Sequence, residues 1–153
     1  MRSRGFTLIE LLTVIMIISI LAGMIIAGAF VALENAKKRE AEGDIASLEN
    51  ALSMYETDVG SYPSTGGVVV DNKFKDWLMD NTASVAGWNG PYMHFDSKDL
   101  DGDAFKDPWG NKYNYRCPGI DHSPPDHSDY FDIWSNGPDG INNSGGGDDI
   151  NNW

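Results

Sequence analysis

Three aspartates near the C-terminus are the residues whose chemistry stands out in this chain of 153 residues. Asp139 is followed by a loop rich in Gly and Asn and then by the pair Asp148-Asp149, so a turn in this loop would bring three carboxylates together. Hard oxygen ligands of this kind suit Ca²⁺, which takes about six to eight of them. The residues alone leave two interpretations open, a calcium loop and a solvated acidic tail.

A second acidic cluster precedes a Pro-Trp-Gly sequence and offers a candidate second calcium site. Its members are Asp99, Asp101, Asp103 and Asp107. The alternating carboxylates resemble a calcium loop, but Gly102 is not at the sixth position and no glutamate closes the loop, so this is not an EF-hand. A solvated loop is the alternative.

Glu10 is the one ionisable side chain in residues 6–33. It is followed by Leu11–Leu33, 23 residues without a charge, which as a helix would measure roughly 34 Å and cross a bilayer core. A carboxylate at the edge of such a helix is costly unless it is paired. No basic residue follows until Lys37, so a partner must come from the chain terminus or another molecule. Solvation at headgroup level is the alternative.

Other potentially reactive side chains give weaker signals. His94, His122 and His127 fall in expected loops, where exposed residues are a simpler interpretation than metal ligands. Cys117 is expected to pack beside Trp109 or Tyr115. The sequence shows no Ser/His/Asp or Cys/His constellation, and we predict that the protein is not an enzyme.

The charge balance excludes whole classes of partner. The chain holds 11 Lys and Arg against 23 Asp and Glu, a net charge of -12. Nucleic acids and anionic membrane surfaces are recognised by basic faces, so neither is an expected partner. A single cysteine rules out an intrachain disulfide.

The elements that position these residues follow from hydrophobic periodicity. Beyond the uncharged run, a stripe at helical steps of three and four consists of Ile45, Leu48, Leu52, Tyr55 and Val59. Gly60 and Pro63 end it, so one helix is predicted from about Phe6 to Val59. Ser19, Gly23 and Ala27 form a small-residue face, and the run from Ser19 to Ala27 contains no proline to break the helix.

The remainder predicts an α+β layout. Asp71 is expected to cap a short helix from Asn72 to Asn81. Residues 112–117 and 130–135 are predicted strands of a small antiparallel sheet that packs against the helical stripe.

The leader Arg4-Gly5-Phe6-Thr7-Leu8-Ile9-Glu10 resembles the class III signal of type IV pilins and type II secretion pseudopilins. The resemblance implies that a prepilin peptidase cuts between Gly5 and Phe6 and that the new amine of Phe6 is methylated. Glu10 would then pair with Phe6 of a neighbouring subunit inside a filament, where an unpaired charge is expensive. The implied parts are a cleaved leader (1–5), a transmembrane and filament-core helix (6–33) and a globular domain (34–153).

Later motifs narrow the resemblance to the major pseudopilins of type II secretion. In chain order they are Tyr62-Pro63-Ser64-Thr65, Asp107-Pro108-Trp109-Gly110-Asn111, Gly137-Pro138-Asp139-Gly140 and Asp148-Asp149-Ile150-x-Asn152-Trp153. The resemblance implies a pilin fold with a C-terminal Ca²⁺ site. Its ligands would be the carboxylates of Asp139, Asp148 and Asp149 and the backbone carbonyl of Asn136.

The function implied is that of a structural subunit of a helical pseudopilus, which assembles from the bacterial inner membrane and drives protein export. Implied partners are further copies of the chain, the prepilin peptidase, minor pseudopilins and the inner-membrane assembly platform, with the globular domain in the periplasm. One alternative is the major subunit of a type IV pilus, acting in adhesion, motility or DNA uptake. A second is a secreted calcium-binding module or hydrolase released at Ala29, because the basic start and Ala27-Gly28-Ala29 resemble a secretory signal.

Overall fold

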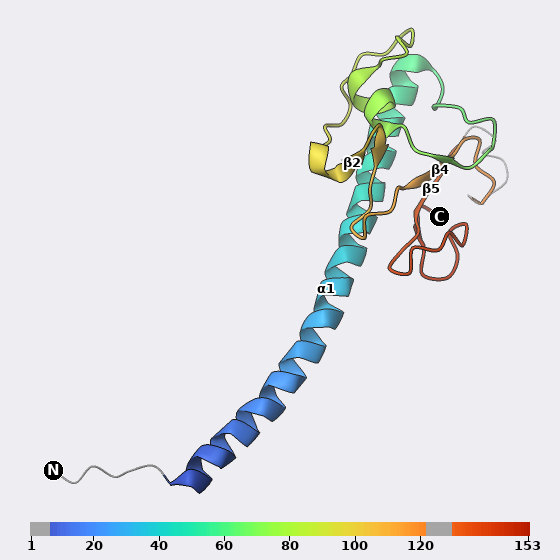
Figure 1. Cartoon of the computed structure of the whole chain (residues 1–153). Helices are drawn as coiled ribbons and strands as arrows, with labels where there is room; N and C mark the ends of the chain where they lie inside the picture. The colour runs from blue at the N-terminus through green and yellow to red at the C-terminus, as the bar shows by residue number, and fades with distance from the viewer. Residues whose placement is uncertain (1–6, 122–129) are drawn as a thin grey trace. The chain divides into compact units, whose positions relative to one another are not determined.

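The computed structural model describes residues 7–121 and 130–153, and its first element is one long helix, α1 (Leu8–Val59) (Figure 1). The predicted helix is confirmed over the described residues. By contacts between residues, the chain divides into two compact units, and the boundary falls inside α1 between Ala36 and Lys37.

The N-terminal unit is a helix whose described side chains are exposed as far as Leu33. Every described side chain in Leu11–Leu33 is exposed, and the mean hydropathy reaches 2.8. By length and composition this helix can cross a membrane. The hydroxyl of Ser19 donates to the carbonyl of Ile15 at 2.7 Å, so this polar group is satisfied within the helix. The helix runs unbroken past Gly23, as the absence of proline predicts.

The C-terminal unit contains the rest of α1, which is amphipathic. Its buried residues at the predicted helical steps are Ile45, Leu48, Leu52 and Tyr55, and Val59 is half-buried against the same cluster. Gly60 ends the helix with φ at +87°, and its N–H donates to the carbonyl of Glu56 at 2.7 Å.

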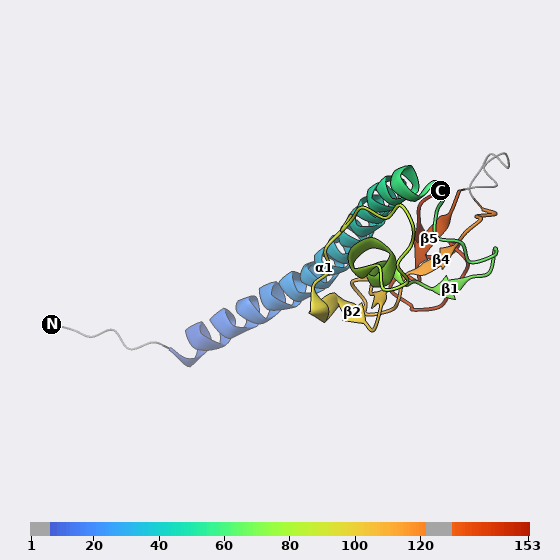
Figure 2. The same ribbon diagram turned by 90° about the horizontal axis from the view of Figure 1, so that it is seen from above.

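Four short strands form an antiparallel sheet in the order β1-β4-β5-β6 (Figure 2). Their bounds are β1 (Val70–Asp71), β4 (Asn114–Arg116), β5 (Asp132–Ser135) and β6 (Ile150–Asn151). In the central pair, Tyr115 lies opposite Ile133. The two predicted strands are therefore confirmed, although each is shorter than its apolar pattern.

Aromatic side chains join this sheet to α1. The fully buried members of the shared core include Tyr113, Tyr115, Phe131 and Ile133. The rings of Tyr115 and Phe131 stack with centroids 5.8 Å apart, and Cys117 is buried in the same cluster. The α+β layout is confirmed, with the aromatic face of the sheet on the helical stripe.

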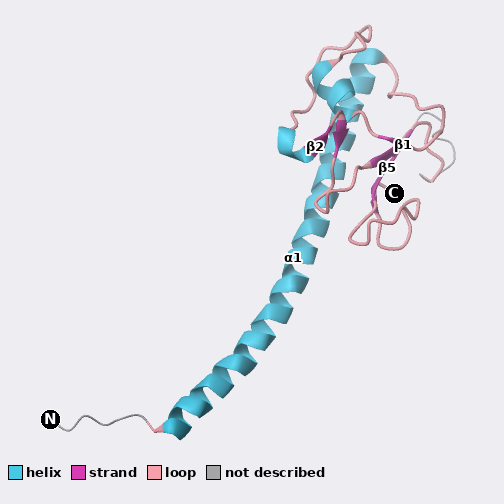
Figure 3. Ribbon diagram, in the orientation of Figure 1, coloured by secondary structure: helices cyan, strands magenta, loops and turns pink. Residues whose placement is uncertain are grey.

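Loops make up most of the remainder of this unit (Figure 3). The short elements among them are η1 (Asp76–Asp80), η2 (Ser97–Asp99) and the hairpin β2 (Leu100–Asp101) with β3 (Ala104–Phe105).

One local expectation about these short elements was wrong. Asp71 does not cap the short helix, because it lies in β1 and its carboxylate accepts a hydrogen bond from Lys112 Nζ at 3.1 Å. The helix η1 begins only at Asp76, and its N-cap residue Lys75 makes no side-chain capping bond. The buried Asn72 lies ahead of it, and its Oδ1 accepts from the N–H of Phe74 at 3.4 Å.

Candidate functional site

The N-terminus of α1 carries a capping box formed by Thr7 and Glu10. The backbone N–H of Thr7 donates to Glu10 Oε2 at 2.9 Å, and the Thr7 hydroxyl donates to the same oxygen at 2.8 Å. In return, the N–H of Glu10 donates to Thr7 Oγ1 at 3.3 Å. Gly5 and Phe6, the predicted processing site, lie outside the described residues.

This capping box is a structural feature that the sequence analysis did not predict, although Thr followed three residues later by Glu is its signal. It gives the Glu10 carboxylate a local partner at the edge of the uncharged run. The contacts leave Glu10 exposed within the chain, so its carboxylate remains available to a partner from another molecule.

The structure brings the three C-terminal aspartates onto one loop. Asp148 Oδ2 accepts a hydrogen bond from the N–H of Asp139 at 3.2 Å, which ties the start of the loop to its end. Gly137 makes this close approach possible, because a Cβ there would lie 2.3 Å from the carbonyl oxygen of Asp148. The predicted return of the loop is therefore present.

Asp149 is the most enclosed of the three carboxylates. Its Oδ2 accepts from the N–H groups of Asn143 and Gly145 at 2.9 and 2.8 Å. Its Oδ1 is buried and has no hydrogen-bond partner, the single such side-chain atom among the described residues. A buried acceptor without a donor is costly, and a cation is one group that would satisfy it.

Charge repulsion adds to this cost. Burial raises the pKa of Asp149, the two amides that it accepts from oppose the shift, and the neighbouring charges of Asp148 and Asp139 raise it further. No lysine or arginine makes an ion pair with these three aspartates in the described part of the chain. The loop therefore concentrates negative charge without an internal counter-charge.

The loop offers a cation only a few side-chain ligands. Over residues 7–121 and 130–153, no three Asp, Glu, His or Cys side chains converge as a ready metal cluster. A cation on this loop would therefore depend on carbonyl oxygens as well as carboxylates, as Ca²⁺ sites do. Asn136 points its side chain elsewhere, since Oδ1 accepts from Asn114 Nδ2 at 2.7 Å, and this leaves its backbone carbonyl as the predicted ligand.

Trp134 of the sheet contacts this loop and the C-terminal residue. Trp134 is fully buried in β5, and its indole N–H donates to Asn142 Oδ1 at 3.0 Å. The ring of Trp153 meets Trp134 edge to face, with centroids 6.0 Å apart. Trp153 also lies against Gly145, where a Cβ would come within 2.1 Å of its ring.

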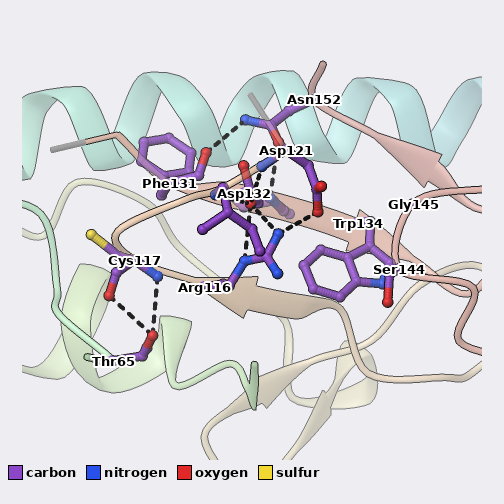
Figure 4. A network of polar contacts seen from close by, with 12 residues as sticks. Thr65, Arg116, Cys117, Asp121, Phe131, Asp132, Trp134, Ser144, Gly145 and Asn152 are labelled. Atoms are coloured by element: carbon purple, nitrogen blue, oxygen red, sulfur yellow. Dashed lines mark hydrogen bonds and ion pairs between the residues drawn. The ribbon is translucent and has the colours of Figure 1, made fainter. Parts of the chain in front are cut away.

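A buried ion pair lies beside Trp134 (Figure 4). The guanidinium of Arg116 lies 5.7 Å from the Trp134 ring centre and pairs with Asp132 and Asp121. Burial alone would raise the pKa of Asp132, but Arg116 and the amides of Ile120 and Asp121 outweigh it and hold the pKa below its usual range. This pair was missed because its partners come from different strands, and no local pattern reveals it.

The second acidic cluster has a different geometry. Asp101 pairs with Lys112 at 3.2 Å and Asp103 lies 3.9 Å from Lys75. Asp107 is buried, and its carboxylate accepts from the amides of Trp109 and Asn111 and from the hydroxyl of Ser135. Asp99 lies 3.9 Å from Lys98. The structure does not bring these four carboxylates together.

The histidines contribute nothing to either region in the described structure. His94 is exposed in the loop before η2. His122 and His127 lie outside the described residues.

Two family profiles match the chain. The family described as type II secretion system (T2SS), protein G, matches residues 29–153, and the prokaryotic N-terminal methylation motif matches residues 1–26. Similar proteins named type II secretion system core protein G come from Pectobacterium carotovorum (36% identity, 99% of this chain and 85% of that protein), Escherichia coli K12 (35%, 99% and 92%) and Pseudomonas aeruginosa (35%, 97% and 94%).

A solved structure also resembles the chain. It is the major pseudopilin from the type 2 secretion system of enterohaemorrhagic Escherichia coli, with a TM-score of 0.46 and 27% identity. The match covers 81% of this chain and 92% of that one.

Proposed function

The chain belongs to the type II secretion system protein G family, and we propose from this premise that it is a structural subunit of a helical pseudopilus. One observation carries the proposal: an uncharged helix of membrane-spanning length, with every described side chain exposed, precedes a folded α+β unit. Such a surface is stable only in lipid or against other helices of the same kind. A subunit that leaves the membrane to join a helical bundle meets both conditions.

The family match favours a secretion pseudopilus over the two alternatives. A released calcium-binding module or hydrolase would lose this helix at Ala29, and the family match includes both the methylation motif and the residues after it. A type IV pilus subunit would share the helix, but the family profile over residues 29–153 is that of the secretion system protein.

Processing and partners follow from this role. We expect cleavage between Gly5 and Phe6 by a prepilin peptidase, methylation of Phe6, and a globular unit on the periplasmic side of the inner membrane. The assembled fibre would contact minor pseudopilins and the inner-membrane platform, and its growth would push exported proteins outward.

Two measurements test the role. Mass spectrometry of the mature chain should give an N-terminal methylated Phe6, whereas a chain that begins at Phe30 would establish the secreted interpretation. Replacement of Glu10 by Ala or Gln should leave the protein folded and inserted in the membrane but abolish regular filaments, because the amine of Phe6 loses its counter-charge in an apolar bundle. Glu34→Gln, the same chemical change beyond the uncharged run, is the matched control. Normal filaments from Glu10→Ala would contradict the proposal.

We further propose that the C-terminal loop binds one Ca²⁺ ion. The unpartnered Oδ1 of Asp149, the adjacent carboxylates of Asp139 and Asp148, and the carbonyl of Asn136 support this site. Calcium would cancel the repulsion among the aspartates and satisfy the buried oxygen.

Isothermal titration calorimetry of the full chain in detergent measures this binding directly. We expect one calcium per chain and no competition from equimolar magnesium, because Mg²⁺ demands a smaller, rigid octahedral shell. Absence of binding heat and of any displacement of a fluorescent calcium indicator would refute the site.

A further inference from the structure

The last five residues have two distinct faces. In an extended segment, successive side chains point to opposite sides, and residues 149–153 follow this rule around β6. Asp149, Asn151 and Trp153 contact the candidate calcium loop: Asp149 accepts from the amide of Gly145, Asn151 Nδ2 donates to the carbonyl of Gly145 at 2.7 Å, and Trp153 covers the same glycine.

The residues between them face the other way. Ile150 is half-buried against the main hydrophobic core. Asn152 Nδ2 donates to Glu49 Oε1 of α1 at 3.1 Å. The same nitrogen donates to the carbonyl of Phe131 at 3.4 Å (Figure 4). Asn152 Oδ1 also accepts from the N–H of Ile133 at 2.8 Å. One asparagine therefore joins the tail to β5 and to the filament helix, across 103 residues of sequence from Glu49.

We propose that Asn152 and Glu49 form a latch that couples occupancy of the calcium loop to the order of α1. This inference rests on the calcium site proposed above. The loop contacts one face of the tail and α1 contacts the other. An ordered loop therefore holds the tail in the position in which Asn152 reaches Glu49. Asn152 is a positioning residue, because it acts on the ion through the tail and not by coordinating it.

Linkage makes the coupling reciprocal. If calcium strengthens the latch, the latch must strengthen calcium binding by the same factor. Without the latch the tail is ordered in a smaller fraction of molecules, and the apparent affinity for calcium falls by that fraction. The reciprocal effect should appear on α1, where bound calcium should slow amide hydrogen exchange around Glu49.

Glu49 Oε1 accepts from both Asn152 Nδ2 and the Tyr130 hydroxyl, at 3.1 and 3.4 Å, so a Glu49 variant cuts the latch together with the Tyr130 contact, whereas Asn152→Ala cuts the latch and spares the Tyr130 contact. Glu49→Ala removes the acceptor on α1 but leaves both contacts between Asn152 and Ile133 in place. Glu49→Gln keeps an oxygen at the same reach and should rescue the latch. Glu42→Ala, at an exposed glutamate on the same helix, controls for the loss of one charge.

The experiment uses the full chain in detergent, with calcium as the probe. Calorimetry gives the calcium affinity, and hydrogen exchange read by mass spectrometry gives the protection of peptides covering residues 45–52 and 139–149. In the wild type, calcium should protect both peptides. Glu49→Ala should weaken calcium binding about fivefold and remove the protection of the helix peptide, while Glu49→Gln and Glu42→Ala behave like the wild type.

The outcomes separate the two proposals. If Glu49→Ala binds calcium with wild-type affinity and its helix peptide still gains protection, the latch is wrong and the calcium site stands. If the wild-type loop peptide itself gains no protection from calcium, the site fails and the coupling fails with it. Asn152→Ala supplies a second variant, expected to show the same loss as Glu49→Ala or a larger one.

Discussion

Two acidic regions of this protein look alike in sequence and differ in structure. Around β2 and β3, Asp101 and Asp103 form ion pairs with Lys112 and Lys75. Asp107 accepts hydrogen bonds from donors of its own chain. In the C-terminal loop, Asp139, Asp148 and Asp149 form no ion pair with a lysine or arginine of the described residues, and one buried oxygen lacks a donor. The comparison teaches that the density of carboxylates does not identify a cation site. A better criterion for a candidate site is negative charge for which the fold supplies no counter-charge.

The largest expected effect on stability comes from Asp107, whose carboxylate is satisfied by hydrogen bonds within the chain. Asp107→Ala leaves the amides of Trp109 and Asn111 and the hydroxyl of Ser135 without their acceptor. We expect a loss of about 3 kcal/mol in the free energy of unfolding, equal with chelator and with calcium. Urea unfolding followed by tryptophan fluorescence measures it, and a loss confined to calcium-containing buffer would reverse the comparison.

The next effect belongs to the C-terminal loop and should appear only with calcium. Asp139→Ala, Asp148→Ala and Asp149→Ala should each abolish most of the calcium-dependent gain in unfolding free energy, about 2.7 kcal/mol at a hundredfold excess over Kd. Asp101→Ala is the matched control and should retain it. Equal losses in all four variants would mean that the two regions do not differ in the way described.

Asp44, a carboxylate outside both regions, adds a dependence of stability on pH to the comparison. Asp44 of α1 shares a small pocket with Glu40, Asp99 and Asp107, and burial followed by repulsion from these acids raises its pKa to about 6, against the hydrogen bond from Tyr113. The folded state therefore holds its proton more tightly than the unfolded state. Between about pH 4 and pH 6, stability from this group falls as pH rises.

Asp44→Asn removes that dependence. At pH 7.5 the variant should have the higher free energy of unfolding, by less than about 1 kcal/mol because solvent reaches the group, and should therefore melt at a higher temperature. Near pH 4 the two proteins should melt at the same temperature. Thermal melts across this range measure the difference. A variant that melts below the wild type at pH 7.5 would show that the hydrogen bond from Tyr113 outweighs burial.

The smallest effect concerns the exposed ion pairs. Lys112 lies near both Asp71 and Asp101, so Asp101→Ala should change the unfolding free energy by no more than about 0.5 kcal/mol. Raising the salt concentration should shrink that change further, since exposed pairs are screened. A change of several kcal/mol would give this cluster a role that its geometry does not support.

Local patterns predicted the parts of the fold that depend on local physics. The helical steps from Ile45 to Tyr55 fixed the buried face of α1, and the aromatic runs around Tyr115 and Ile133 located the central strands. β4 is shorter than its pattern because Lys112 and Tyr113 pair with Lys106 and Phe105 and not with the sheet. The return of the C-terminal loop was also predictable, because Gly137 permits an approach that a side chain would block.

Contacts between distant segments were not predictable in this way. Arg116 with Asp132 and Asn152 with Glu49 are pairs whose members are unremarkable in their own neighbourhoods. Asp107 was counted as a candidate ligand because it ends an acidic run, but its donors include Ser135, which only the fold brings near. One local signal was overlooked, the Thr7 to Glu10 spacing of a capping box.

Thermal melting of the fragment 34–153, which contains all the buried core residues of the described structure, tests the central claim most directly. The midpoint should be lowest with chelator and rise with free calcium, and it should keep rising beyond saturation as binding to the folded state requires. Magnesium at the same concentration should leave it near the chelator value. A midpoint that calcium does not move, or that magnesium moves equally, would show that the C-terminal aspartates form a solvated acidic loop and not a calcium site.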